Sequence, residues 1–157
     1  MRKIYLLFTL LVMGLGIAHA DAISPTALTI SNFEANGPTY ATVSWSYIGN
    51  GQIDVLVQAA PNYGIFGNGG AAFGFNLVNP DNQLAFTMVT AGLSVGANPC
   101  SATCTMDGFG SFEYTVNSGP ASQAVSSIEF YIGDGSRFTS STDLSHVFDA
   151  NASGHDF

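Results

Sequence analysis

The chain has 157 residues, of which 46% are hydrophobic and 9% are charged, and its formal net charge is −8. This composition excludes an intrinsically disordered chain, because disorder accompanies low hydrophobicity and high charge. Beyond residue 20, eleven acidic residues are balanced only by Arg137, which gives a net charge of −10. A chain with one basic residue cannot neutralise phosphates, so nucleic-acid binding and adhesion to an anionic membrane surface are excluded as functions.

Residues 1–20 have the three parts of a secretory signal peptide. Arg2 and Lys3 form the basic start, residues 4–17 are mostly apolar, and Ala18-His19-Ala20 is a small-x-small cleavage site. The apolar run is too short for a bilayer-spanning helix, which needs roughly 20 residues. We therefore predict an exported bacterial protein whose mature part, residues 21–157, is a single domain without a membrane span.

Strict alternation of apolar and polar residues begins near residue 41. Four apolar residues are predicted to point inward from one strand: Ala41, Val43, Trp45 and Tyr47. Asn50-Gly51 then supplies the positive φ angles of a tight turn. The alternation resumes after the turn, with Ile53, Val55 and Val57 predicted to point inward. The segment from residue 41 to residue 58 is therefore predicted to be a β-hairpin.

Further strands are predicted at residues 28–30, 73–77, 84–89, 112–116 and 128–132, separated by clusters of Gly, Pro and Asn. The residues predicted to face inward from the longer ones are Phe73, Phe75, Leu77, Phe112, Tyr114, Val116, Ile128, Phe130 and Ile132. This spacing predicts an all-β, antiparallel β-sandwich of jelly-roll type. One short helix is expected from Asp143 to Phe148, capped by Ser141 or Thr142, with Leu144, Val147 and Phe148 on one face.

Cys100 and Cys104 are the only cysteines. In an oxidising compartment we predict a disulfide between them, worth at most about 2 kcal/mol through the entropy of so short a loop. The alternative is a metal site, but a tetrahedral zinc site needs a further pair of Cys or His ligands. We predict no zinc site.

Asp143 and His146 are the strongest candidates for catalysis, because residues three apart on a helix are neighbours. They could form a general base oriented by a carboxylate, or part of a metal site. The competing interpretation is a surface pair beside a helix cap. Since no Gly-x-Ser-x-Gly motif or other placed nucleophile accompanies them, we predict no catalytic residue. His155 and Asp156 lie too near the chain end to be expected in a site.

Three turns are rich in oxygen ligands: Asn79-Pro80-Asp81-Asn82, Asp107-Gly108 and Asp134-Gly135-Ser136. Such turns could bind calcium, but turn geometry alone accounts for Asp and Asn, and none matches the twelve-residue calcium loop. We predict no cofactor, with calcium as the weaker alternative.

Four aromatic residues could stack on a sugar ring: Tyr40, Trp45, Tyr47 and Tyr63. Because Trp45 lies on the apolar face of the predicted strand, we expect it in the core instead.

Two stretches resemble bacterial proteins of the PEP-CTERM, exosortase-sorted class. The first runs from Val57-Gln58-Ala59-Ala60-Pro61 through a Gly-rich loop to Ala71-Ala72-Phe73-Gly74-Phe75-Asn76-Leu77. The second is Met106-Asp107-Gly108-Phe109-Gly110-Ser111-Phe112-Glu113-Tyr114, followed by Val125-Ser126-Ser127-Ile128-Glu129-Phe130. The resemblance extends in order over residues 40–157. It implies a secreted or surface-displayed protein of a Gram-negative bacterium, associated with the envelope and extracellular polysaccharide, without enzymatic activity.

The sorting signal of that class is a Pro-Glu-Pro motif, a hydrophobic helix and a basic tail, and the sequence to Phe157 contains none of these. We expect either a C-terminally truncated chain or a released soluble form, so anchoring is not carried over. If a closing strand is missing, a sheet edge would be open to pairing with another chain.

The functional hypothesis is a non-enzymatic envelope or matrix protein that binds an extracellular polysaccharide or a surface protein through the loops Pro61 to Gly70 and Asn98 to Gly108. The alternative is a structural subunit that self-associates through sheet edges. A third hypothesis is an envelope hydrolase that uses Asp143 and His146.

Overall fold

The computed structural model describes residues 22, 25–28, 38–67, 70–79, 84–96, 104–106, 110–118, 123–133 and 135–149. The predicted signal peptide and Cys100 lie outside these described residues. Among the residues that the structure describes, no helix has the length and apolar character that crossing a membrane requires.

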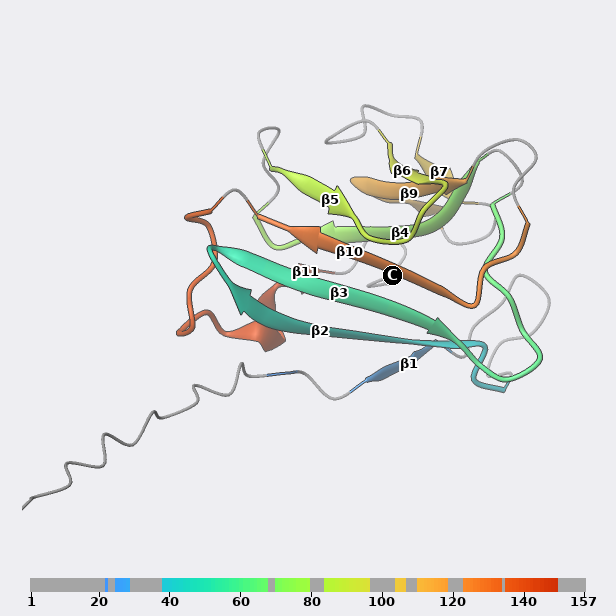
Figure 1. The fold of residues 1–157 in the computed structure, drawn as a ribbon, viewed down its shortest axis with the longest axis horizontal. Coiled ribbons are helices and arrows are strands. Elements are labelled where there is room, and N and C mark those ends of the chain that lie inside the picture. Colours follow the sequence, from blue (N-terminus) through green and yellow to red (C-terminus); the bar gives the residue numbers. More distant parts are fainter. Residues whose placement is uncertain are drawn as a thin grey trace, which may run out of the picture.

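Two antiparallel sheets form the two layers of the domain (Figure 1). The first contains, in spatial order, β1 (Thr26–Leu28), β2 (Ala41–Gly49), β3 (Gln52–Ala59), β10 (Ser127–Ile132) and β5 (Phe86–Met88). The second contains β11 (Phe148–Asp149), β4 (Ala71–Leu77), β9 (Tyr114–Ser118) and β6 (Leu93–Val95). A small separate ribbon pairs β7 (Thr105–Met106) with β8 (Gly110–Ser111). The predicted antiparallel β-sandwich is confirmed.

The predicted hairpin of β2 and β3 is confirmed, with Trp45 opposite Val55 and an irregularity in the register between Tyr47 and Gly49, beside the turn. At its turn Asn50 has φ 52° and Gly51 has φ 69°. Positive φ at both central residues is what a tight hairpin needs to match the twist of its strands. The local sequence therefore accounts for this part of the first sheet.

The core lies between the two sheets, and its centre is a group of stacked rings. The Phe75 ring from β4 lies 5.3 Å from Tyr114 of β9 and 5.4 Å from Phe130 of β10, measured between ring centroids. All three side chains are fully buried. Because Phe130 belongs to the first sheet and the other two to the second, the stack joins the layers. The predicted inward faces of β2, β3, β4 and β10 are confirmed.

Strand β4 is buried on both faces, which one-sided alternation did not predict. Positions 74 and 76 of β4 are on the strand face turned away from the main core, and both Gly74 and Asn76 are nevertheless buried. A Cβ atom on Gly74 would lie 2.6 Å from the Met106 sulfur and 2.7 Å from the Phe112 ring. The second face of β4 is therefore covered by the segment that contains β7, β8 and Phe112.

The predicted inward position of Phe112 beside Tyr114 is wrong. Phe112 is buried, but it covers Gly74 outside the main core cluster. The reason is a break in the ladder before β9, where the Glu113 backbone N–H donates to Asn76 Oδ1 at 2.8 Å. This side-chain acceptor replaces a strand partner, so the alternation of β9 begins only at Tyr114.

Two strand boundaries also differ from the predictions. The first strand ends at Leu28, and the predicted continuation through Thr29 and Ile30 lies outside the described residues. The strand predicted from residue 84 begins only at Phe86, although Leu84 is buried. Burial of an apolar residue therefore does not mark the start of hydrogen-bonded pairing here.

The predicted helix from Asp143 to Phe148 is a single 3₁₀ turn, η1 (Leu144–His146). Asp143 caps this turn, and the predicted cap Thr142 instead accepts a hydrogen bond from Thr139 N–H at 2.9 Å. Phe148 was predicted on the helix but belongs to β11, where it pairs with Leu77. Pairing with β4 ends the turn, because strand hydrogen bonds require extended backbone. Leu144 and Val147 are buried as expected.

Candidate functional site

Two tyrosines from separate segments meet at one end of the five-stranded sheet. Tyr40 immediately precedes β2, and Tyr63 lies in the loop after β3. Their ring centroids are 5.3 Å apart at an interplanar angle of 87°, an edge-to-face arrangement. Tyr63 is 48% exposed, and Phe66 in the same loop is 53% exposed. We call Tyr40 and Tyr63 the aromatic platform.

The turn that carries Tyr63 follows from its sequence. The Tyr63 N–H donates to the carbonyl oxygen of Ala60 at 3.0 Å, and Asn62 between them has φ 72°. Proline as the second residue and asparagine at positive φ as the third are the residues that a type II turn selects. Pro61 and Asn62 therefore set the position of the Tyr63 ring locally.

Backbone hydrogen bonds hold this loop on both sides of the turn. The Ala60 N–H donates to the Tyr40 carbonyl oxygen at 2.8 Å. Ile65 and Val125 exchange two backbone hydrogen bonds of 2.8 and 2.9 Å. Because these hydrogen bonds are present without a ligand, binding at the platform would cost little conformational entropy.

The other two aromatic residues predicted as stacking candidates do not belong to the platform. Trp45 is 7% exposed, and its indole N–H donates to the Leu144 carbonyl oxygen at 2.8 Å. Tyr47 packs against the core from the inward face of β2. The structure therefore brings Tyr40 and Tyr63 together and confirms the predicted core position of Trp45.

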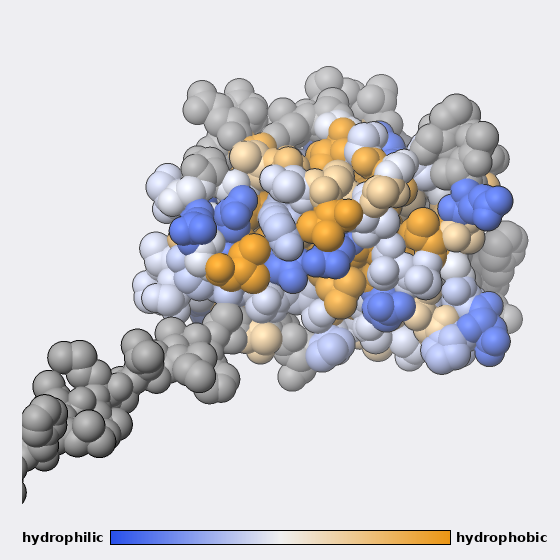
Figure 2. All heavy atoms as spheres, viewed as in Figure 1, coloured by the Kyte–Doolittle hydropathy of each residue, from blue (hydrophilic) through white to orange (hydrophobic). Residues whose placement is uncertain are grey.

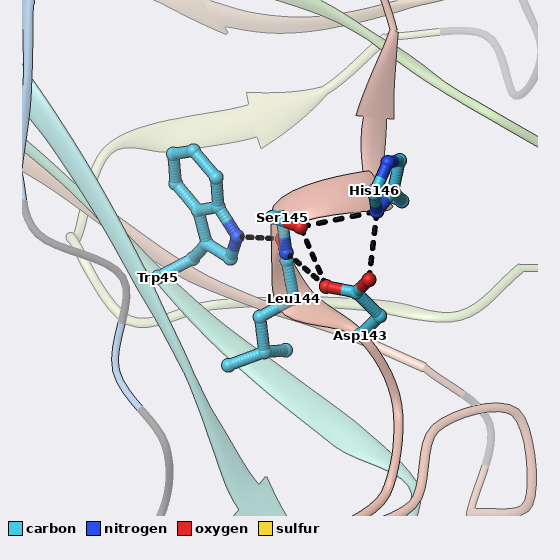
Figure 3. A network of polar contacts seen from close by, with 5 residues as sticks. All are labelled: Trp45, Asp143, Leu144, Ser145 and His146. Carbon is cyan, nitrogen blue, oxygen red and sulfur yellow. Dashed lines mark hydrogen bonds and ion pairs between the residues drawn. The ribbon is translucent and has the colours of Figure 1, made fainter.

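Asp143, Ser145 and His146 form an exposed polar network at η1 (Figure 3). Asp143 Oδ1 accepts hydrogen bonds from the Ser145 N–H at 3.0 Å and the Ser145 hydroxyl at 2.6 Å. Asp143 Oδ2 lies 2.8 Å from His146 Nδ1. The hydrogen bonds from Ser145, and then the contact with His146, lower the pKa of the Asp143 carboxyl. The predicted proximity of Asp143 and His146 is confirmed.

This network has the geometry of a helix cap. In a hydrolytic triad the serine lies at one imidazole nitrogen and the carboxylate at the other. Here Ser145 Oγ lies 3.0 Å from Nδ1, the same nitrogen that Asp143 contacts. The Ser145 hydroxyl also donates to the Asp143 carboxylate. It therefore does not point at His146 Nε2, the nitrogen that would have to take its proton in a triad.

A pocket of about 340 Å³ borders this network and lies at the small end of the range for ligand sites. It is lined at the end of β4 by Leu77 and Asn79, and on the other side by Arg137 and His146, among others. The Arg137 guanidinium donates to the Asn79 carbonyl oxygen, and its central carbon lies 5.6 Å from the centroid of the Phe138 ring. The Arg137 guanidinium is therefore held against the pocket wall by this hydrogen bond and ring contact.

The predicted metal and disulfide positions fall largely outside the described residues. Asp81, Asp107 and Asp134 are among those not described. Within the described ranges, no three His, Cys, Asp or Glu side chains gather where they could hold a metal ion. Cys104 Sγ lies 3.6 Å from Thr115 Oγ1, while Cys100 lies outside the described residues, so their pairing stays a prediction.

The outer face of the five-stranded sheet adjoins the aromatic platform. Its side chains form three rows across β2, β3 and β10: Thr42, Gln58 and Ser127; Ser44, Leu56 and Glu129; Ser46, Asp54 and Tyr131. Burial, and then the neighbouring Glu129 charge, raise the pKa of the Asp54 carboxyl. Hydrophilic and hydrophobic residues alternate over this side of the molecule (Figure 2).

Comparisons of the chain with protein-family models, with curated proteins and with solved structures found no match. The resemblance to the PEP-CTERM class therefore stays a prediction from the motifs.

Proposed function

We propose that this chain is an exported, non-enzymatic protein of a Gram-negative envelope or extracellular matrix, and that its aromatic platform binds a glycan. The export signal in residues 1–20 and the resemblance to the PEP-CTERM class support the location. The edge-to-face contact between the half-buried Tyr40 and the exposed Tyr63, which lies on a hydrogen-bonded turn, is the observation that carries the binding role.

Sugar chemistry fits such a pair. One face of a pyranose ring presents C–H groups that pack on an aromatic ring, while its hydroxyls require hydrogen-bonding partners around that ring. The platform offers the ring of Tyr63 and two phenolic hydroxyls, and Thr42 and Gln58 lie close by on β2 and β3. An amphipathic ligand is thus better matched than a purely apolar one.

The two other hypotheses have less support. For self-association, the described edge strands β1, β5, β6 and β11 are only two or three residues long, and short edge strands oppose pairing with another chain. For hydrolysis, Asp143 and Ser145 both contact His146 Nδ1, which leaves the proton path of a triad incomplete.

The test is glycan-array screening of the purified exported protein, followed by titration calorimetry with the best ligand. Tyr63→Ala is expected to lower affinity roughly three- to tenfold by removing the stacking ring. Tyr63→Phe, the matched control, should retain most of the affinity because it keeps the ring. Binding of no array glycan, or equal affinity of Tyr63→Ala and the parent protein, would contradict the proposal.

A further inference from the structure

We infer that the glycan site continues from the aromatic platform over the outer face of the five-stranded sheet to Tyr131, and that it takes an extended chain of neutral sugars. This inference rests on the proposed function and adds the length and charge class of the ligand. It is carried by the register of β2, β3 and β10.

The platform and Tyr131 lie on the same face of the sheet. Tyr40 precedes the inward-facing Ala41, so strand alternation places Tyr40 on the outer face. Its backbone continues the ladder, with hydrogen bonds to Leu28 and Ala60. Tyr131 is also on the outer face, opposite Asp54 on β3, and Asp54 is opposite Ser46 on β2.

The register gives the separation of the two aromatic positions. From Tyr40 to the row of Ser46 is about 20 Å along the strands, and β10 lies about 10 Å across from β2. A single sugar cannot span that length, whereas an oligosaccharide can. The path between the two ends is therefore a multi-unit site.

The side chains along this path suit hydroxyl-rich ligands. Thr42, Ser44, Gln58 and Ser127 lie on the rows between the two aromatic ends, and each can donate and accept hydrogen bonds. The Gln58 amide is oriented by a 2.8 Å hydrogen bond to the Ser126 carbonyl oxygen. An obligate protein interface would instead have a continuous apolar centre, which this side of the molecule does not show (Figure 2).

Charge decides which glycans can lie there. The three rows that lead from the aromatic platform to Tyr131 carry the carboxylates of Asp54 and Glu129 and no basic residue. Arg137 is instead tied to Asn79 beyond β4. A polyanionic chain would therefore be repelled along the face, so a neutral chain is the expected occupant.

The experiment titrates the exported protein with neutral β-linked glucose and N-acetylglucosamine oligosaccharides, from disaccharide to hexasaccharide. Affinity is expected to rise with length, with Tyr131→Ala lowering hexasaccharide affinity roughly three- to tenfold while disaccharide affinity stays unchanged. Tyr131→Phe keeps the stacking ring and should recover most of the hexasaccharide affinity that Tyr131→Ala loses. Ser44→Arg, which blocks the middle of the path without touching the core, should also weaken only the longer ligands.

The outcomes separate this inference from the proposed function. Tyr63-dependent binding with equal affinity for short and long ligands, or a hexasaccharide affinity that Tyr131→Ala and Ser44→Arg leave unchanged, would overturn the extended site alone. Preference for oligogalacturonate over the neutral series would overturn its charge class. Absence of binding to every oligosaccharide would overturn both proposals.

Discussion

The indole N–H of Trp45 in β2 donates a 2.8 Å hydrogen bond to the carbonyl oxygen of Leu144, although the two residues are 99 positions apart. The bond is buried and connects the first sheet to the turn η1 that leads into β11 (Figure 3). The same indole packs edge-to-face on Phe148, with ring centroids 4.8 Å apart. One side chain thus satisfies a buried carbonyl and closes one side of the sandwich.

Trp45→Phe tests that hydrogen bond. Phenylalanine retains an aromatic ring for the core but leaves the Leu144 carbonyl oxygen without its donor, so we expect a loss of about 1–3 kcal/mol in the free energy of unfolding. Urea denaturation followed by circular dichroism measures it. Tyr131→Phe on the outer face of the five-stranded sheet is the control and should change stability little, because Tyr131 is only half-buried and the substitution keeps its ring. Equal stability of Trp45→Phe and the parent would show that water replaces the indole.

Gly74→Ala tests the cover on the second face of β4. The added methyl group would lie within 2.8 Å of Met106 and Phe112 atoms, so overpacking should cost about 1–3 kcal/mol. In a Phe112→Ala background the same substitution should cost less, because the Phe112 ring atoms are gone and the flexible Met106 side chain can shift into the space they leave. A double-mutant cycle from chemical denaturation measures this coupling. Additive effects would mean that Phe112 does not cover Gly74.

Asp54→Asn is expected to stabilise the protein at neutral pH. Burial and the Glu129 charge raise the pKa of Asp54 above 3.8 in the folded state. Since the folded state then holds its proton more tightly, the carboxylate destabilises the fold as pH rises through the folded pKa, and has no such effect below the unfolded pKa. Thermal unfolding at pH 7 and near pH 3 measures the difference. A rise in Tm of the same size at both pH values would contradict the raised pKa of Asp54 as the cause.

Asp143→Ala is expected to destabilise the protein at neutral pH, the opposite of the effect expected for Asp54→Asn. Hydrogen bonds from Ser145 and the contact with His146 lower the pKa of Asp143 in the folded state, so its stabilising contribution is fully present above the ordinary aspartate pKa of the unfolded chain. That contribution is lost as pH falls through the folded pKa. The variant should therefore have a lower Tm than the parent at pH 7, and the gap should narrow in acid. Ser141→Ala serves as the control, because it removes a hydroxyl that lies 2.8 Å from Thr139 Oγ1, a contact between neutral groups whose loss should not depend on pH.

Local sequence was sufficient to predict the hairpin of β2 and β3. Alternation from Ala41 to Tyr47 assigns one face to the core, and Asn50-Gly51 supplies the backbone angles of the turn. The core position of Trp45 follows from the same alternation. These features depend on residues that are close along the chain, so a pattern of period two reports them directly.

Three other features were decided only by the tertiary structure. Whether Phe112 continues the inward face of β9 depends on Asn76, which lies on another strand and takes the Glu113 N–H. Whether Phe148 ends a helix or starts β11 depends on its pairing with Leu77. Tyr40 and Tyr63 could be named from the sequence as sugar-stacking candidates, but only the fold brings their rings into contact. Each of these outcomes is set by competition between partners distant in sequence, and periodicity carries no information on which partner is nearer in space.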